Sequence, residues 1–197
     1  FWNGADYAYR EGGVLRAPAY GVDGGTATTD TGPLTASVNN QITGSISTDS
    51  ISMPTLKIAG SHTLTINDGQ TLTFGGGVLA TCGDAVITGG AAIANGTNAF
   101  VVRVNQLTDT LTLSTGNITG TGGLTKSGAG TLIIETPNSR TGTTEIAEGT
   151  VRLAGIGTLS GDNVTTNIRQ GAVLDLNGLG TGTSIGQFNN MGLVTNS

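Results

Sequence analysis

Five carboxylates are the residues of this chain whose chemistry could cleave a polysaccharide. Enzymes of that kind bring two or three acids together on neighbouring elements and give them different pKa values. The acids concerned are Asp109, Glu135, Glu145, Glu148 and Asp175. They sit at different offsets from the nearest strand-like segments, so they do not share a column. We therefore interpret them as solvated surface acids and predict no catalytic residue.

Metal and nucleophile chemistry lacks its usual residues. His62 is the single histidine, so the chain has neither a histidine pair for zinc nor a convincing Ser-His-Asp triad. Walker-type loops, G-x-G-x-x-G and the glycine-rich calcium nonapeptide are missing too. Cys82, the single cysteine, is interpreted as a small buried side chain. An intermolecular bridge or a reactive thiol is the alternative. No metal and no cofactor are expected.

Aromatic residues gather in an N-terminal segment, residues 1–33. This segment holds Phe1, Trp2, Tyr7, Tyr9 and Tyr20, and Phe188 lies near the other end of the chain. One interpretation is a cap or junction whose rings cover the open end of a stack of repeats. The other is a platform that contacts sugar rings. The six aromatics are therefore the predicted assembly or glycan contacts.

Composition excludes two classes of partner. The net charge is -5, and the eight Lys and Arg residues are scattered singly, so no basic patch is available for nucleic acid. No apolar run approaches the length of a membrane span, so membrane insertion by this segment is not expected. The chain begins at Phe1-Trp2 without Met, which predicts an N-terminus processed or cut from a longer precursor.

Short strand-like segments recur at a spacing of about 19 to 22 residues, which indicates a repeat architecture. They begin near Ser50, Thr71, Ala91, Thr110, Thr131, Thr150 and Ala172. A coil of this size has no core of its own, but stacked coils bury their inward side chains as ladders. We predict an all-β, right-handed parallel β-helix over residues 34–197, with coils of about 20 residues. Its inward residues would include Leu64, Leu72, Leu111, Leu132, Val151 and Leu174.

A sandwich of two sheets is the alternative architecture, because it also uses many short strands. Hairpin signals are rare, however, and Asn95-Gly96 and Asn177-Gly178 are the plausible ones. The regular spacing therefore favours the β-helix.

Residues Gly120 to Ala154 carry a more specific pattern. Gly122 to Leu132 reads GGLTKSGAGTL, and Thr141 to Val151 reads TGTTEIAEGTV. This stretch resembles the passenger-associated repeat of bacterial autotransporter passengers, whose pattern is G-G-L-x-K-x-G-x-G-T-L followed by T-G-x-T-x-[VI]-x-x-G-T-[LV]. The family usually has an aromatic residue just before the T-G step, where this chain has Arg140.

The resemblance implies a passenger that is carried across the outer membrane of a Gram-negative-type bacterium and folds outside the cell. We therefore expect a non-enzymatic extracellular structural solenoid, part of a cell-surface or secreted protein. It would associate head to tail or continue into neighbouring repeats as a longer fibre. The alternatives are an adhesin module that binds glycans or a host surface, and a polysaccharide-active enzyme.

Overall fold

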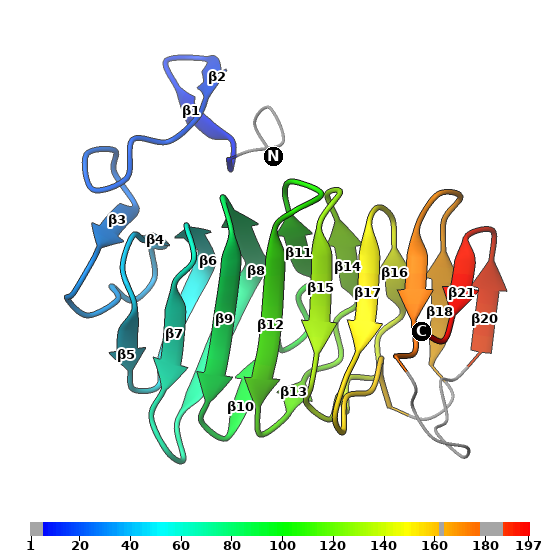
Figure 1. The fold of residues 1–197 in the computed structure, drawn as a ribbon. Coiled ribbons are helices and arrows are strands. Elements are labelled where there is room, and N and C mark those ends of the chain that lie inside the picture. The colour runs from blue at the N-terminus through cyan, green and yellow to red at the C-terminus, as the bar shows by residue number, and fades with distance from the viewer. Residues whose placement is uncertain (1–5, 162–163, 178–186) are drawn as a thin grey trace.

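The computed structural model describes residues 6–161, 164–177 and 187–197 of the 197-residue chain. In these residues the chain winds into a parallel β-solenoid of about six turns, with coils of about 22 residues. The prediction of an all-β solenoid with coils of about 20 residues is confirmed. Strands of one sheet run down the near side in Figure 1, those of the other run up the far side, and successive coils advance to the right. This winding is right-handed.

Two long parallel sheets form the walls of the described part of the solenoid. The eleven-stranded sheet, called sheet I, contains β3 (Thr26–Thr29), β4 (Asn39–Ile42), β6 (Ile51–Ala59), β8 (Thr71–Thr81), β10 (Ala92–Ala94), β11 (Phe100–Val104), β13 (Ile118–Thr119), β14 (Leu124–Ser127), β16 (Thr144–Ile146), β18 (Thr165–Ile168) and β20 (Gln187–Asn190). The eight-stranded sheet, called sheet II, contains β5 (Ile46–Thr48), β7 (Thr63–Ile66), β9 (Asp84–Gly89), β12 (Thr110–Thr115), β15 (Thr131–Ile134), β17 (Thr150–Leu153), β19 (Val173–Asp175) and β21 (Leu193–Thr195).

An antiparallel hairpin lies outside both sheets. It consists of β1 (Tyr9–Glu11) and β2 (Val14–Arg16), with Arg10 opposite Leu15. Figure 1 shows it standing off the N-terminal end of the solenoid. The strand β3 already belongs to sheet I, where Thr26 pairs with Asn39. Residues 26–29 of the predicted N-terminal segment are therefore the first strand of the stack. The boundary at residue 33 remains a prediction.

The core is a set of ladders produced by the parallel register. In sheet II, Leu111, Leu132, Val151 and Leu174 occupy one inward column on successive coils. Alternation of side chains along each strand turns these residues inward and their neighbours toward solvent. The six inward residues predicted from the sequence are all fully buried. That part of the prediction is confirmed.

The predicted coil starts occupy two different sides of the coil. Thr71 pairs with Ala92 on a short third side, which is formed by the first part of β8 with β10 and β13. Thr110 instead pairs with Asp84 and with Thr131 in sheet II. The sequence period therefore passes from one column to another near Thr110. The sequence does not reveal this change of column, because Thr71-Leu72-Thr73 on the third side and Thr110-Leu111-Thr112 in sheet II show the same alternation.

Glycine shapes some corners through close approach of neighbouring coils. Gly128 has a φ of 77°, and a Cβ at this position would lie 2.1 Å from the carbonyl oxygen of Val104. A side chain would therefore push two coils apart at this corner. Cys82 has a φ of 64° at another corner and is exposed. The interpretation of Cys82 as a buried residue is wrong, because the turn from β8 into β9 directs its side chain outward.

Candidate functional site: the N-terminal hairpin and the repeat coil

The N-terminal aromatics lie on the flank of the solenoid where they are described. The Tyr7 hydroxyl donates toward the carbonyl oxygens of Leu56 at 3.1 Å and Gly77 at 3.2 Å, in β6 and β8. Burial is the main cause that raises the pKa of Tyr7 well above its ordinary value. The ring therefore contacts the side of sheet I. Phe1 and Trp2 lie outside the described residues.

Asp6 and Lys57 fasten the same segment. The Lys57 ammonium pairs with the Asp6 carboxylate, and it also lies 5.6 Å from the centre of the Tyr20 ring. Tyr20 in turn donates its hydroxyl to Asp6 at 3.2 Å. Burial, followed by the charge of Asp6, raises the pKa of Tyr20 well above its ordinary value. Two of the predicted contact tyrosines thus hold the segment on the solenoid.

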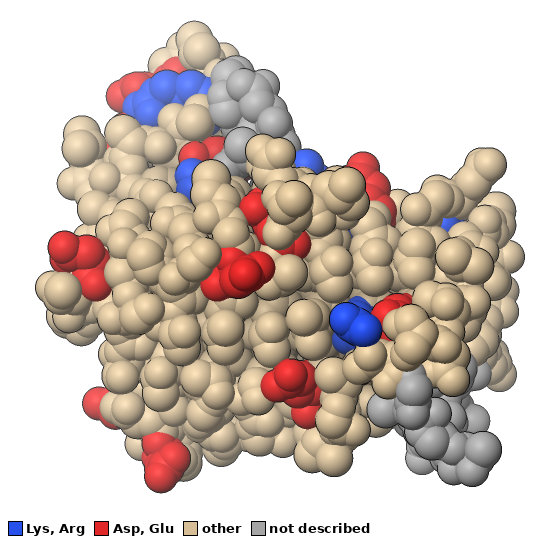
Figure 2. All heavy atoms as spheres, in the orientation of Figure 1, with Lys and Arg blue, Asp and Glu red and all other residues tan. Residues whose placement is uncertain are grey.

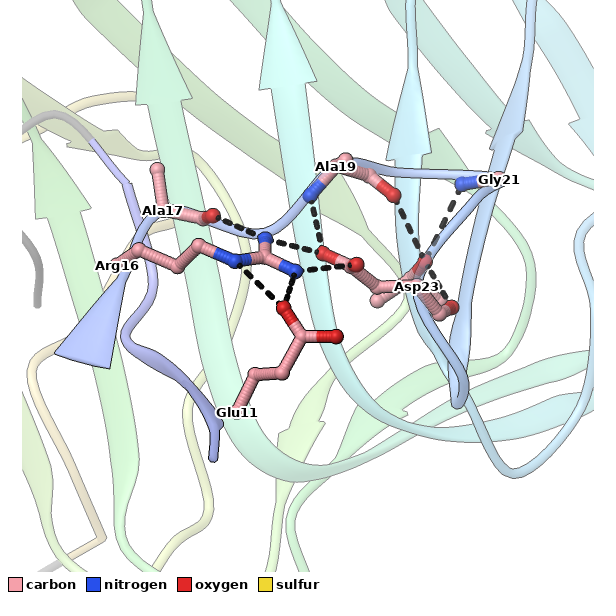
Figure 3. Close-up of polar contacts among 7 residues, drawn as sticks. Glu11, Arg16, Ala17, Ala19, Gly21 and Asp23 are labelled. Carbon is pink, nitrogen blue, oxygen red and sulfur yellow. Dashed lines mark hydrogen bonds and ion pairs between the residues drawn. The ribbon is translucent and has the colours of Figure 1, made fainter. Parts of the chain in front are cut away.

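Arg16 orients the hairpin through two carboxylates, as Figure 3 shows. Its two terminal nitrogens each lie 2.6 Å from an Asp23 oxygen, and Nη2 lies 2.7 Å from Glu11. A guanidinium that binds a carboxylate through two parallel hydrogen bonds is held in a defined plane, in addition to the attraction between the two charges. The guanidinium and the Ala19 amide lower the pKa of Asp23 to about 2. The clamp fixes how the hairpin is presented.

The clamped hairpin exposes apolar and aromatic groups. Val14 is 65% exposed and Leu15 is 53% exposed. Tyr9 lies under the Arg16 guanidinium, 4.8 Å from its ring centre to Cζ, which is within cation–π range. Phe188, from the other end of the chain, is partly buried and packs against the core. Among the described aromatics, Phe188 thus lies apart from Tyr7, Tyr9 and Tyr20, at the other end of the stack.

The predicted acids are also separated and serve local structure. Asp109 is buried and accepts the amides of Cys82, Gly83 and Gln106, which closes a corner. Asp175 in sheet II binds Arg152 and accepts hydrogen bonds from Ser197.

Glu145 lies in β16 of sheet I, Glu148 lies at the corner between β16 and β17, and Glu135 is exposed after β15. Glu145 pairs with Arg169. Glu148 accepts the Gly128 amide at 2.8 Å and lies 3.6 Å from Arg103. In the described residues, no group of three or more His, Cys, Asp or Glu side chains is placed to hold a metal ion.

A buried lysine is the first unexpected feature of the repeat. Lys126 occupies the inward column of sheet I between Val102 and Ile146 and is fully buried. Its Nζ donates to three backbone carbonyls, those of Ser127 at 2.9 Å, Gly128 at 2.8 Å and Glu148 at 3.1 Å. Burial lowers the pKa of Lys126 to about 7. Period-two alternation from Leu124 could have placed it inward from the sequence.

A buried arginine is the second unexpected feature of the repeat. Arg140 is fully buried and reaches both neighbouring coils. Nη1 donates to the Gly122 carbonyl at 3.1 Å, and Nη2 donates to Thr144 Oγ1 at 3.0 Å and to the Leu159 carbonyl at 3.3 Å. Burial lowers its pKa to about 10. Arg140 thus packs inside the coil at the position where the repeat family has an aromatic residue.

Comparison with known proteins agrees with this geometry. The family model described as "Passenger-associated-transport-repeat" matches residues 124–153, which span β14 to β17 on two successive coils and contain Lys126 and Arg140. The chain carries a passenger-associated-transport-repeat. The resemblance seen in Gly120 to Ala154 is confirmed by this match.

One relative covers more of the chain. It is "Adhesin BmaC autotransporter" of Brucella suis biovar 1 (strain 1330), which is 38% identical over 104 residues. The match covers 52% of this chain and 3% of the relative, so the chain spans a small fraction of that protein. No solved structure matches the chain. No helix in its described part is long and apolar enough to cross a membrane.

Proposed function

We propose that the chain is a non-enzymatic structural segment of an autotransporter-type adhesin, displayed outside a Gram-negative-type bacterium at the outer membrane or released from it. The passenger-associated-transport-repeat and the adhesin relative support this location and role. The engagement of four of the five acids in corners, ion pairs and ladders supports a role without bond-breaking chemistry.

The unbroken parallel register is the observation that carries the structural role. Sheet I continues without a break to β20, and sheet II continues to β21. The free edge of a parallel strand pairs readily with another strand. We propose that these edges pair with a neighbouring coil of a longer chain, or head to tail with a second copy. Such contacts do not close into a ring and give a rod or fibre.

Sedimentation over a wide protein concentration tests the head-to-tail arrangement. We expect wild-type protein to associate into longer species, which negative-stain images would show as rods. Leu193→Lys in β21 should weaken association, because a charge on an edge strand opposes pairing. Leu107→Lys, at an exposed corner between β11 and β12, is the matched control and should associate as wild type does. Monomers at every concentration would overturn head-to-tail assembly.

Protease treatment of intact cells that express the parent protein tests location. The chain should be degraded from outside while cytoplasmic proteins remain whole. Protection of the chain until the cells are lysed would contradict surface display.

Ligand binding by the adhesin is the second candidate function, favoured by the clamped hairpin. Of the six aromatics predicted as assembly or glycan contacts, Tyr7, Tyr20 and Phe188 pack against the solenoid, whereas Tyr9 belongs to the hairpin, where it pairs with Arg16 and where Val14 and Leu15 are exposed. A glycan array with wild type and with Tyr9→Ala tests this candidate. Loss of bound glycans in the variant would support the hairpin as the contact.

A further inference from the structure

A polar groove lies at the C-terminal end of sheet I, far from the hairpin. It encloses about 410 Å³ where β18 and β20 end side by side. Its lining combines amides, one guanidinium and a thioether: Asn167, Ile168, Arg169, Asn189, Asn190 and Met191. No carboxylate lines it. On the opposite face, formed by sheet II, Figure 2 shows isolated acids and bases on a largely uncharged surface.

An amide ladder fixes the wall of this groove. Asn189 donates its Nδ2 to Asn167 Oδ1 at 3.0 Å, and Asn167 donates its Nδ2 to Glu145 Oε2 at 3.3 Å. The three residues face the same side of successive strands, because Glu145 pairs with Asn167 and Asn167 with Asn189. The direction of the ladder leaves Asn189 Oδ1 as an acceptor with no partner among the described residues. Asn190 pairs with the inward residue Ile168, so its side chain faces away from this ladder, and its Oδ1 accepts the Gly192 amide.

Arg169 supplies the charge of the groove. Its Nε donates to Glu145 Oε1, which orients the guanidinium and partly neutralises it. The two terminal nitrogens make no hydrogen bond to a described residue, and the side chain is 53% exposed. A free guanidinium fork matches a carboxylate in two parallel hydrogen bonds.

We propose that the groove between Asn189 and Arg169 binds an acidic saccharide through the carboxylate of a sugar ring. The Arg169 fork receives the carboxylate, while Asn189 Oδ1 supplies an acceptor for a ring hydroxyl. Exposed Met191 offers an apolar surface to the ring. Glu145 already neutralises part of the Arg169 charge. The remaining positive charge therefore matches a singly charged carboxylate better than a doubly charged phosphate.

This binding site goes beyond the structural role, because a rod segment requires no ligand. It also differs from the hairpin as a contact, since the groove lies at the opposite end of the stack (Figure 1). Failure of the ligand test would leave the proposed assembly and location untouched, because sedimentation tests the first and protease treatment of intact cells tests the second.

Calorimetric titration of the full chain with a tetrasaccharide of uronic acid tests the proposal. Two probes accompany it: the same tetrasaccharide with its carboxyl groups reduced to alcohols, and a short neutral peptide with a free C-terminal carboxylate. We expect the uronic acid to bind at least tenfold more tightly than either. Arg169→Gln and Asn189→Ala should each weaken that binding at least tenfold. Arg10→Gln, which removes the same charge from the hairpin, should leave it unchanged.

Four results would overturn the proposal. Equal binding of the reduced saccharide would remove the role of the carboxylate, and equal binding of the peptide would remove the saccharide. Absence of binding, or equal loss in Arg10→Gln, would also refute the site. Circular dichroism and melting of Arg169→Gln establish that its solenoid is intact, and Asn189→Ala provides a second variant that keeps the charge.

Discussion

Lys126 and Glu148 tie two coils together at one corner. The Lys126 ammonium donates to the Glu148 backbone carbonyl at 3.1 Å, and the Glu148 carboxylate accepts the Gly128 amide at 2.8 Å. The two residues belong to successive coils, because Thr125 in β14 pairs with Glu145 in β16. A cation inside the solenoid therefore closes a glycine corner that no larger residue could form.

The burial of Lys126 predicts a pH-dependent stability. Its pKa is lowered to about 7 by burial first, raised in part by Glu148 and lowered further by Arg103. Above pH 7 the folded state releases this proton, whereas the unfolded state keeps it up to about pH 10.4. The unfolded state then binds more protons, so the free energy of unfolding rises with pH across this window, by up to about 1.4 kcal/mol per pH unit. Below pH 7 the contribution is flat.

Denaturant unfolding of wild type and Lys126→Met between pH 6 and about 10 checks this sign. Methionine has a similar length and no titrating group, so the variant should lose most of the rise. An identical pH profile in the two proteins would show that Lys126 does not cause it.

Arg140 predicts opposite outcomes for two substitutions. Arg140→Ala should lower the free energy of unfolding by about 2–5 kcal/mol, because it leaves a cavity and removes the hydrogen bonds that the guanidinium donates to the Gly122 carbonyl and to Thr144. Arg140→Phe places the aromatic residue of the repeat family at this position and removes a buried charge. It should be at least as stable as wild type. Melting temperatures of Arg140→Ala and Arg140→Phe test this prediction. Equal losses of stability in the two variants would mean that the charge of Arg140 is required.

Leu132 and Thr131 test the register of sheet II. Leu132→Asp should cost several kcal/mol, because it places a charge without a partner in an apolar column. Thr131→Asp, on the outward side of the same strand, should change stability by about 1 kcal/mol or less. Melting temperatures measure both. If Leu132→Asp melts within a degree or two of wild type, the inward column is wrong.

Glu135 and Asp175 test the absence of bond-breaking chemistry. We expect no depolymerisation of pectin-like polymers by wild type, measured as release of reducing ends. The double variant Glu135→Gln with Asp175→Asn should behave alike in this assay, although it should melt lower because Arg152 and Ser197 lose Asp175 as their partner. Activity that disappears in the double variant but persists in Thr131→Asp would contradict the proposal.

The solenoid could be predicted from the sequence because the alternation within each strand is a local pattern and the same pattern recurs in every coil. Thr-Leu-Thr alternation gives the inward face of each strand, and the short spacing between strands gives the coil, so Leu111 and Leu132 could be placed without a structure. Lys126 and Arg140 were missed because charged residues are seldom fully buried unless paired, and several of the carbonyls that accept their hydrogen bonds are about 20 residues away in the sequence. The flank position of Tyr7 depends on Leu56 and Gly77, which are distant in sequence and carry no pattern that points to it.

The direction of the hydrogen bonds decides how such a rod behaves under tension. The backbone hydrogen bonds between successive coils run along the long axis of the solenoid. A pull on its two ends therefore breaks the hydrogen bonds of one coil after another. The force needed to open the solenoid is then set by the hydrogen bonds of each single coil and does not grow with the number of coils. Lys126 and Arg140 tie the repeat coil to its neighbours through the carbonyls of Glu148, Gly122 and Leu159. In single-molecule pulling on the two ends of the chain, we expect this coil to give way last.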